Sequence, residues 1–127
     1  GSELYILQCT STYPASFDTI NLRAMETLAQ RYDRPVGLSG HHKGIAVDAA
    51  AVALGARIVE RHFTLDRTWK GSDHAASLEP PGLAKLVRDI RAVEAALGDG
   101  EKRLQDCELA ARSKLRGAVA LVDEEAA

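Results

Sequence analysis

The stretch VGLSGHHKGIAVDAAAVALGARIVERHFTL, residues 36–65, decides the fold of this chain. Short apolar runs at its start and near its end pass into polar residues, as buried strands do where they emerge into loops. The Ala-rich segment 44–55 between them predicts a helix, with Gly55 in the place of a C-terminal cap. A strand, a helix and a second strand in this order predict two parallel strands joined by a crossover helix.

The same pattern extends to both sides of this stretch. Residues 4–10 are predicted to form a strand, and residues 16–32 a helix capped by Ser16 or Asp18. Apolar side chains at helical spacing predict a last amphipathic helix over residues 81–98. Three strand-helix units indicate an α/β protein with a parallel sheet, either doubly wound or part of a (β/α)₈ TIM barrel. A complete barrel needs about 250 residues, so only part of one fits within this chain.

The composition excludes several classes of protein. The 16 Lys and Arg residues and the 18 Asp and Glu residues are interspersed and give a net charge of -2, so we expect no nucleic-acid partner. No apolar run approaches the roughly 18 residues of a membrane span, and no signal segment opens the chain. We therefore expect a soluble, cytoplasmic protein without a membrane partner. Cys9 and Cys107 are too few and too far apart for a disulfide framework, and reduced thiols are expected.

The two ends indicate a piece of a longer protein. The leading Gly1-Ser2, without an initiator Met, is typical of a cleaved expression tag. Residues 1–100 hold the strand-helix units, and residues 101–127 are predicted to be a polar linker with one short helix near residues 108–115. The apolar GAVALV at residues 117–122 has no partner in what remains, so we expect a further domain to follow.

Candidate functional residues stand at the ends of the second and third predicted strands. Because side chains alternate along a strand, Ser39 and His41 share one face, and Glu60 and His62 share the face that would line a barrel's lumen. Imidazoles from two neighbouring strand ends predict a divalent-metal site, completed by water and substrate. The alternative is that these rings only pack or bind backbone carbonyls. His42 is expected to point away from His41, as a loop or surface residue.

Two loops carry further candidates. After the first strand, Ser11 and Tyr13 offer hydroxyl groups that could orient a polyol or a phosphate, although such residues are equally common in turns. The loop from residue 64 to residue 80 is long enough to be functional, but ordinary solvated polarity is the alternative. Its acid-base and anion-binding candidates are Asp66, Lys70, Asp73 and His74.

Several motifs, taken together and in order, resemble the sialic acid synthase family. They are LQCTSTYP, VGLSGHHKGIAV, AAVALGARIVERHFTLDRTWKGSDHAASLEP and LGDGEKRLQDCELAARSKLRG, which together span residues 7–117. Enzymes of this family condense phosphoenolpyruvate with N-acetylmannosamine or its 6-phosphate to give N-acetylneuraminate or its 9-phosphate. The resemblance implies a (β/α)₈ barrel followed by a small antifreeze-like domain, in a dimer where that domain covers the partner's site. This chain corresponds to the last three βα units and the start of the linker toward that domain.

The resemblance also implies a metal site. His41 in SGHH and His62 in ERHFT fall on the family's two metal-binding histidines, which usually serve Mn²⁺, with Mg²⁺ or Co²⁺ as alternatives. A divalent ion there would polarise the aldehyde of the open-chain sugar. Glu60 and Asp73 are our candidates for catalytic groups that orient metal-bound water or a sugar hydroxyl.

The resemblance implies substrate contacts as well. Ser39 falls on a residue near the phosphoenolpyruvate phosphate, and Tyr13 and Asp73 fall on positions that contact the sugar. Ser11 is a further candidate for substrate binding and stands where some bacterial members have Asn. Competing interpretations are a related nonulosonic acid or spore-coat polysaccharide synthase, or a scaffold without a competent site. We also expect self-association and no synthase activity from this piece alone, because other family residues lie outside it.

Overall fold

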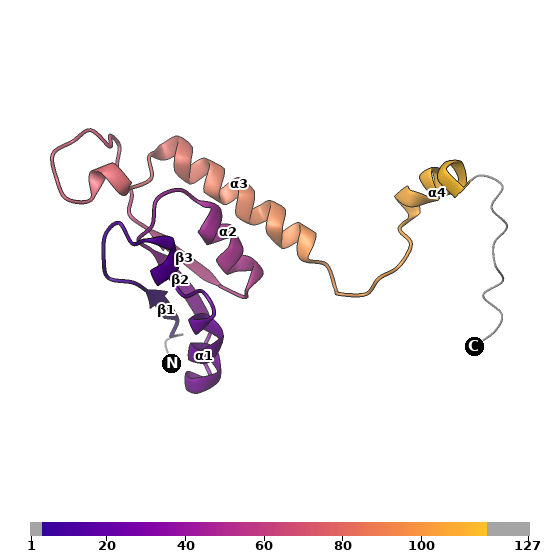
Figure 1. The fold of residues 1–127 in the computed structure, drawn as a ribbon, viewed down its shortest axis with the longest axis horizontal. Coiled ribbons are helices and arrows are strands. Elements are labelled where there is room, and N and C mark those ends of the chain that lie inside the picture. Colours follow the sequence, from indigo (N-terminus) through magenta and orange to yellow (C-terminus); the bar gives the residue numbers. More distant parts are fainter. Residues whose placement is uncertain (1–3, 117–127) are drawn as a thin grey trace.

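A three-stranded parallel sheet, in the order β1-β2-β3, forms the centre of the computed structural model, which describes residues 4–116 (Figure 1). The strands are β1 (Ile6–Cys9), β2 (Val36–Gly40) and β3 (Ile58–Arg61). Cys9 pairs with Ser39, and Ser39 pairs with Glu60, so these three residues form one row across the sheet. The parallel sheet predicted from the sequence is confirmed, and all three strands end at the same edge.

Four α-helices follow the strands in the described part of the chain. They are α1 (Ala24–Tyr32), α2 (Ala46–Ala53), α3 (Pro80–Leu97) and α4 (Leu109–Arg116), and short 3₁₀ helices cover Phe17–Thr19, His74–Ala76 and Asp106–Glu108. The alternation of strands and helices is as predicted. The prediction for the first helix was wrong at its start, since α1 begins at Ala24 instead of residue 16.

The late start of α1 has a local cause. The amide of Thr19 donates to the carbonyl of Ser16, which closes a separate 3₁₀ turn. Asn21 then has a φ of 50°, in the left-handed region, and this interrupts any continuous right-handed helix. Neither Ser16 nor Asp18 therefore caps α1, which is preceded by Arg23 without a side-chain cap.

Helices α1 and α2 cover one face of the sheet. Met25 of α1, Leu38 of β2 and Ala51 of α2 are almost fully buried against one another at the centre of this layer. Because side chains alternate along a strand, the row of Cys9, Ser39 and Glu60 lies on the opposite face. In a closed barrel that face lines the lumen.

The loop after β3 is closed at its base. Phe63 and Leu78 form a parallel bridge, in which the amide of Thr64 donates to the carbonyl of Leu78 at 2.9 Å. The amide of Leu78 in turn donates to the carbonyl of His62 at 2.9 Å. Residues 64–77 therefore project as one loop from a fixed base beside the end of the sheet (Figure 1).

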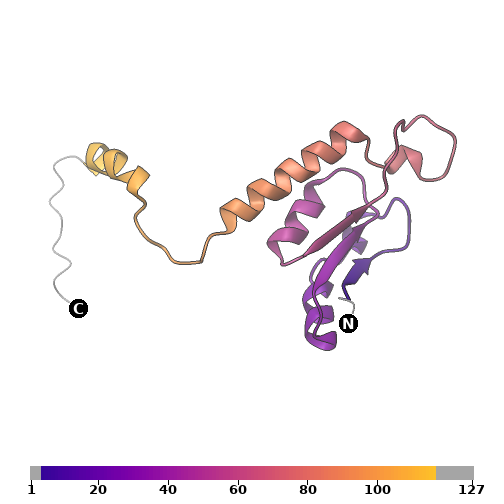
Figure 2. The same cartoon turned by 180° about the vertical axis from the view of Figure 1, so that it is seen from behind.

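The C-terminal part extends away from the sheet. Helix α3 packs along α2, and Gly98 ends it with a φ of 61°, a conformation that favours glycine. An extended segment then leads to α4, which lies away from the sheet in both views (Figures 1 and 2). The short predicted helix is thus present, whereas Gly1-Ser2 and the GAVALV stretch lie outside the described residues. No helix within residues 4–116 is long and apolar enough to cross a membrane.

Candidate functional site

Two imidazole rings meet at the carboxyl edge of the sheet. His41 follows β2 and His62 follows β3, and their ring centroids lie 5.1 Å apart with planes inclined by 74°. The rings meet because the two strands are parallel neighbours and end at the same edge. The expected convergence is therefore present, while the role of the rings as metal ligands stays a prediction.

Tyr13 completes an aromatic cluster with these histidines. Its ring stacks on His62, with centroids 4.1 Å apart and planes 18° from parallel, and meets His41 edge to face at 5.3 Å. The amide of Ala15 donates to the carbonyl of His41 at 2.8 Å and so ties the loop that carries Tyr13 to the end of β2. The Tyr13 hydroxyl lies 3.4 Å from Ser77 Oγ, at the base of the loop after β3.

Asp73 reaches the same cluster from the loop after β3. Its Oδ2 lies 3.6 Å from Nδ1 of His62, and both side chains are partly exposed to solvent. At this distance the two groups interact electrostatically without a direct hydrogen bond. The carboxylate stands on the Nδ1 side of the ring, which leaves Nε2 for another partner.

A row of polar side chains lies below the two imidazoles on the lumen-side face of the sheet. Ser39 Oγ donates a hydrogen bond of 2.6 Å to Glu60 Oε1 and so links β2 to β3. Cys9 Sγ lies 3.8 Å from Nε2 and 3.9 Å from Nδ1 of His41. Cys9 was not among the predicted site residues, although its position in the first strand has the parity that points into the lumen.

A cavity of about 340 Å³ opens between β3 and the following loop. Its lining includes His62, Asp73, His74 and Ser77. This volume is at the lower end of the range of about 300–1,000 Å³ that is typical of small-molecule sites. The cavity therefore brings one of the two imidazoles and the Asp73 carboxylate to a space of the size that a small polar molecule needs.

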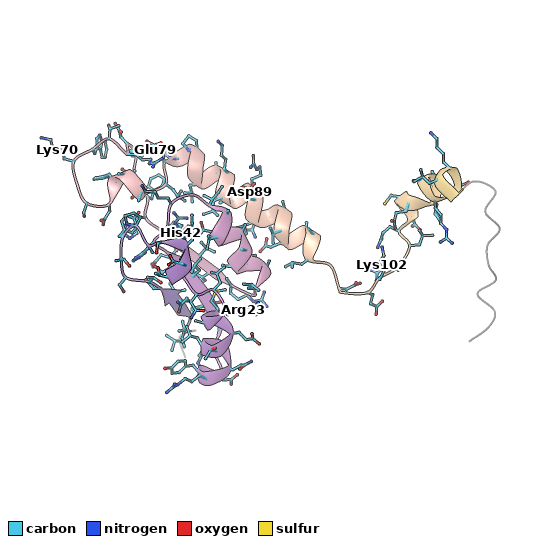
Figure 3. The ribbon with its side chains drawn as sticks, viewed as in Figure 1. Arg23, His42, Lys70, Glu79, Asp89 and Lys102 are labelled. Atoms are coloured by element: carbon cyan, nitrogen blue, oxygen red, sulfur yellow. The ribbon has the colours of Figure 1, made fainter. Side chains whose placement is uncertain are left out.

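Two other candidates stand apart from the cluster. Ser11 is exposed on the loop after β1 and, within the described residues, makes no hydrogen bond to the two rings. Lys70 is exposed at the far end of the loop after β3 and points away from the sheet (Figure 3). The structure does not bring either residue to the imidazoles.

The remaining candidates in the loop after β3 make hydrogen bonds within that loop. His74 Nδ1 lies 2.8 Å from the buried hydroxyl of Thr64. Asp66 accepts hydrogen bonds from the side chain and the amide of Thr68, at 2.6 Å and 2.8 Å. These bonds, the one from the Thr68 hydroxyl first, hold the pKa of Asp66 below its ordinary value. Asp66 is thus an ionised residue that shapes the turn, and it contacts neither imidazole.

The expectation for His42 was right about the loop and wrong about the surface. His42 does point away from His41, but it is fully buried instead of lying at the surface, between the end of β2 and α2 (Figure 3). It is enclosed because Asp48 of α2 and Arg61 of β3 supply polar partners in the interior. Asp48 and Arg61 were not predicted to have a role, since their partners come from different elements.

The donor set that these residues offer is limited to two imidazoles. Among residues 4–116 there is no group of three or more His, Cys, Asp and Glu side chains placed to hold a metal ion. Neutral imidazoles suit divalent first-row metals, and a site of two imidazoles leaves positions for water and substrate. The chemistry of His41 and His62 is therefore compatible with an open metal site and incompatible with a closed structural one.

The fold and its polar carboxyl edge define part of a (β/α)₈ barrel of the kind that carries enzyme sites. Comparison with family models gives a match to the NeuB family over residues 1–102. The chain belongs to the NeuB family.

The relatives that it matches include synthases of sialic acids and related sugars. The chain is 56% identical to the N-acetylneuraminate-9-phosphate synthase of Homo sapiens over 110 residues, which are 86% of this chain and 31% of that protein. It is 47% identical to the N,N'-diacetyllegionaminic acid synthase of Legionella pneumophila over 118 residues, 93% of this chain and 33% of that protein. The chain thus spans about a third of the length of these relatives.

Solved structures of the same group share its fold. The N-acetylneuraminic acid synthetase of Leptospira borgpetersenii, solved in complex with citrate, matches with a TM-score of 0.73 and 40% identity, over 91% of this chain and 40% of that chain. A spore coat polysaccharide biosynthesis protein of Bacillus subtilis matches with a TM-score of 0.69 and 36% identity, over 80% of this chain and 29% of that chain. The parallel sheet of this chain is accordingly a segment of a TIM barrel.

Proposed function

We propose that this chain is the C-terminal part of the barrel of a cytoplasmic sialic acid synthase, followed by a linker from residue 101 toward an antifreeze-like domain. The intact enzyme condenses phosphoenolpyruvate with N-acetylmannosamine or its 6-phosphate. The products are N-acetylneuraminate or its 9-phosphate, and inorganic phosphate. The observation that carries the proposal is the meeting of the His41 and His62 rings, with centroids 5.1 Å apart, in a chain that is 56% identical to an N-acetylneuraminate-9-phosphate synthase.

In this proposal His41 and His62 hold a divalent ion, Mn²⁺ in the first place and Mg²⁺ or Co²⁺ as alternatives. When bound, the ion supplies positive charge that stabilises the negative charge developing on the aldehyde oxygen of the open-chain sugar. The enol carbon of phosphoenolpyruvate attacks the aldehyde carbon and forms the new carbon-carbon bond. Water then adds to the cationic carbon that carries the phosphate, and the phosphate leaves.

The other residues orient the reacting groups. Asp73 faces Nδ1 of His62 at 3.6 Å, so it attracts the ring electrostatically from that side and leaves Nε2 for a ligand. Tyr13 fixes the plane of the same ring by stacking and offers its hydroxyl to the sugar. We assign Asp73 and Glu60 the orientation of water or a sugar hydroxyl.

Two serines complete the substrate contacts. Ser39 donates a hydrogen bond to Glu60, and we assign its hydroxyl a place near the end of phosphoenolpyruvate that carries the phosphate. Ser11, exposed on the loop after β1, is assigned to the sugar side. Because the row of Ser39 and Glu60 lies below the rings, the two substrates enter from the open end of the barrel.

The proposal includes a homo-oligomer, a dimer for the intact enzyme. The three strands described here leave an unpaired edge at β1 and at β3, which the rest of the barrel would cover in the intact enzyme and which favours self-association of the 127-residue chain alone. We expect no synthase activity from the 127-residue chain alone. The intact enzyme is expected to elute as a dimer in size-exclusion chromatography with light scattering, and a monomer would contradict this part of the proposal.

A related synthase is the second candidate. The 47% identity to a legionaminic acid synthase and the fold shared with a spore coat polysaccharide protein favour a different acylated aminosugar as acceptor. The chemistry at the metal and at phosphoenolpyruvate would be the same. A third possibility, a scaffold without a competent site, predicts that the protein binds no divalent ion.

Product analysis of the intact enzyme tests these candidates. The enzyme is incubated with phosphoenolpyruvate, Mn²⁺ and each of several 2-acetamido sugars, free and 6-phosphorylated, and the nine-carbon products are identified by mass spectrometry. Turnover with N-acetylmannosamine or its 6-phosphate supports the proposal. Turnover with another 2-acetamido sugar alone supports the second candidate, and saturable Mn²⁺ binding that is lost in His62→Ala excludes the scaffold.

A further inference from the structure

A buried ionic cluster lies on the helix side of the sheet, directly behind the two imidazoles. It consists of Arg61 on β3, Asp48 on α2 and His42 after β2, and none of these side chains is more than 4% exposed. Arg61 Nη1 donates a short hydrogen bond to Asp48 Oδ2, and His42 Nε2 lies 3.4 Å from the same oxygen. The cluster thus joins a strand, a helix and a loop below the surface.

The guanidinium group of Arg61 also binds the backbone of the loop after β2. Its Nη2 donates to the carbonyl of His42 at 2.6 Å, and its Nη1 donates to the carbonyl of Gly44 at 2.7 Å. A guanidinium is planar and presents its donors in a fixed fork, so these bonds set both the position and the orientation of the loop. One side chain therefore fastens the loop after β2 to β3 and to α2.

Both candidate metal ligands are one peptide bond away from this cluster. Arg61 directly precedes His62, and His42 directly follows His41. Since neighbouring side chains in extended backbone point to opposite faces, the cluster holds the backbone from the helix side while the two imidazoles project from the other side. The relative position of the two rings thus depends on the same atoms that Arg61 holds.

Gly40, the last residue of β2, leaves the space that the side chain of Arg61 occupies. A Cβ atom at this position would lie 2.6 Å from Arg61 Cδ, 2.7 Å from Asp48 Oδ1 and 3.0 Å from His42 Cε1. The cluster therefore fills the space that any side chain at position 40 would need. Gly40 and Arg61 are also partners in the register of β2 and β3, so the arginine crosses directly over the neighbouring strand.

The cluster contributes little to the stability of the fold. Burying an ion pair removes charges from water, and this penalty can exceed the attraction between the charges. In the described part of the chain, His42 Nδ1, Asp48 Oδ1 and Arg61 Nε are also buried without a hydrogen-bond partner, which costs further free energy. A fixed geometry of the surrounding backbone is the benefit that offsets such costs.

We propose that Arg61 is a positioning residue that sets the separation and orientation of the His41 and His62 rings. It does so through the carbonyls of His42 and Gly44 and the carboxylate of Asp48. This inference rests on the proposed function, in which the two histidines bind the divalent ion. Arg61 itself contacts neither the ion nor the substrates, because its side chain lies on the opposite face of the sheet.

Two variants of the intact protein test this inference. Arg61→Lys keeps the charge beside Asp48 but replaces the fork by a single ammonium, which cannot hold both carbonyls and the carboxylate. Gly40→Ala keeps all three side chains of the cluster and displaces Arg61 by the added methyl group. Arg57→Lys, at an exposed arginine just before β3, is the matched control. Mn²⁺ affinity is measured by electron paramagnetic resonance, the Co²⁺ absorption spectrum reports ligand geometry, and thermal unfolding checks the fold.

The expected result is a weaker ion site in a folded protein. Arg61→Lys and Gly40→Ala should lower Mn²⁺ affinity on the order of 10-fold and change the Co²⁺ spectrum, as loss of supporting contacts does at metal sites. Arg57→Lys should match the wild type in both. Unchanged affinity and spectrum in the Arg61 and Gly40 variants, with His62→Ala unable to bind, overturn the positioning role alone. Unchanged Mn²⁺ binding in His62→Ala overturns the ligand assignment and the positioning role together.

Discussion

The ring of Tyr13 stacks on the imidazole of His62 at a centroid distance of 4.1 Å, although 49 positions separate the two residues in the sequence. The contact joins the loop after the first strand of the sheet to the end of the third. His41 stands at the end of the middle strand, β2, and its carbonyl accepts a hydrogen bond from the amide of Ala15 in the loop after β1. The loop after β1 therefore reaches across the sheet edge and covers both imidazoles.

Replacing this ring should loosen the site. We expect Tyr13→Ala to lower kcat/KM of the intact enzyme on the order of 10-fold or more, because a small misplacement of a reacting group is costly. Tyr13→Phe keeps the stacked ring and loses only the hydroxyl, whose contact with Ser77 is long at 3.4 Å. Steady-state kinetics of both variants separate the two contributions. Equal losses in the two variants would show that the hydroxyl, and not the stacking, is what matters.

The two imidazoles should be required for metal-dependent turnover. His41→Ala and His62→Ala are each expected to abolish Mn²⁺-dependent turnover of the intact enzyme and to leave its far-UV circular dichroism unchanged, since both rings are partly exposed. Lys43→Ala, at an exposed residue of the same loop, is the control and should behave as wild type. A histidine variant with unchanged turnover and unchanged metal affinity would refute the assignment.

Truncation of a buried side chain of β2 should lower the free energy of unfolding strongly. Leu38 is 1% exposed and packs in the core cluster with Met25 and Ala51, so Leu38→Ala should cost about 2–5 kcal/mol of unfolding free energy. Leu54 is 55% exposed, and Leu54→Ala should change this free energy by no more than about 0.5 kcal/mol. Urea unfolding of the two variants measures the contrast. Similar values for both would mean that β2 is not the centre of the core.

The turn at Asp66 should lose stability as the pH falls. Its carboxylate accepts hydrogen bonds from Thr68, which hold its pKa below the ordinary value in the folded protein. The ionised form is therefore the one that stabilises the turn. This stabilisation is fully present above the pKa of the unfolded chain and is lost as the pH falls through the lower pKa of the folded state.

Removing the hydroxyl tests this relation. Thr68→Ala should raise the pKa of Asp66 toward its ordinary value, because the Thr68 side chain is the largest cause of the shift. Thr68→Ser keeps a hydroxyl and should keep the low pKa. Titration of the Asp66 carboxyl carbon by NMR measures both values. An unchanged pKa in Thr68→Ala would mean that the amide bond alone is sufficient.

The sheet could be predicted because its signals are local. The apolar runs before Thr10, at Val36 and at Ile58 each lead into a polar loop, and parallel order follows from the helices between them. The meeting of His41 and His62 then follows from strand parity and a shared edge. Local patterns in two consecutive strand-helix units carried enough information for this part of the site.

Contacts between distant elements could not be predicted in this way. Asp48 is an ordinary residue in an Ala-rich helix, and nothing near it in the sequence indicates that Arg61 and His42 enclose it. The late start of α1 likewise depends on the left-handed backbone of Asn21, a residue that tolerates this conformation without requiring it. Such features are decided by packing between elements, which local periodicity does not report.

Because of the parallel bridge between Phe63 and Leu78, the loop that carries Asp73 can be exchanged independently of the sheet. The hydrogen bonds of Leu78 to His62 and Thr64 close the base of the loop, so insertions or exchanges between residues 66 and 76 need not disturb the sheet beneath it. The corresponding loop of a relative could therefore be placed on the same anchor as one unit, without repacking the strands.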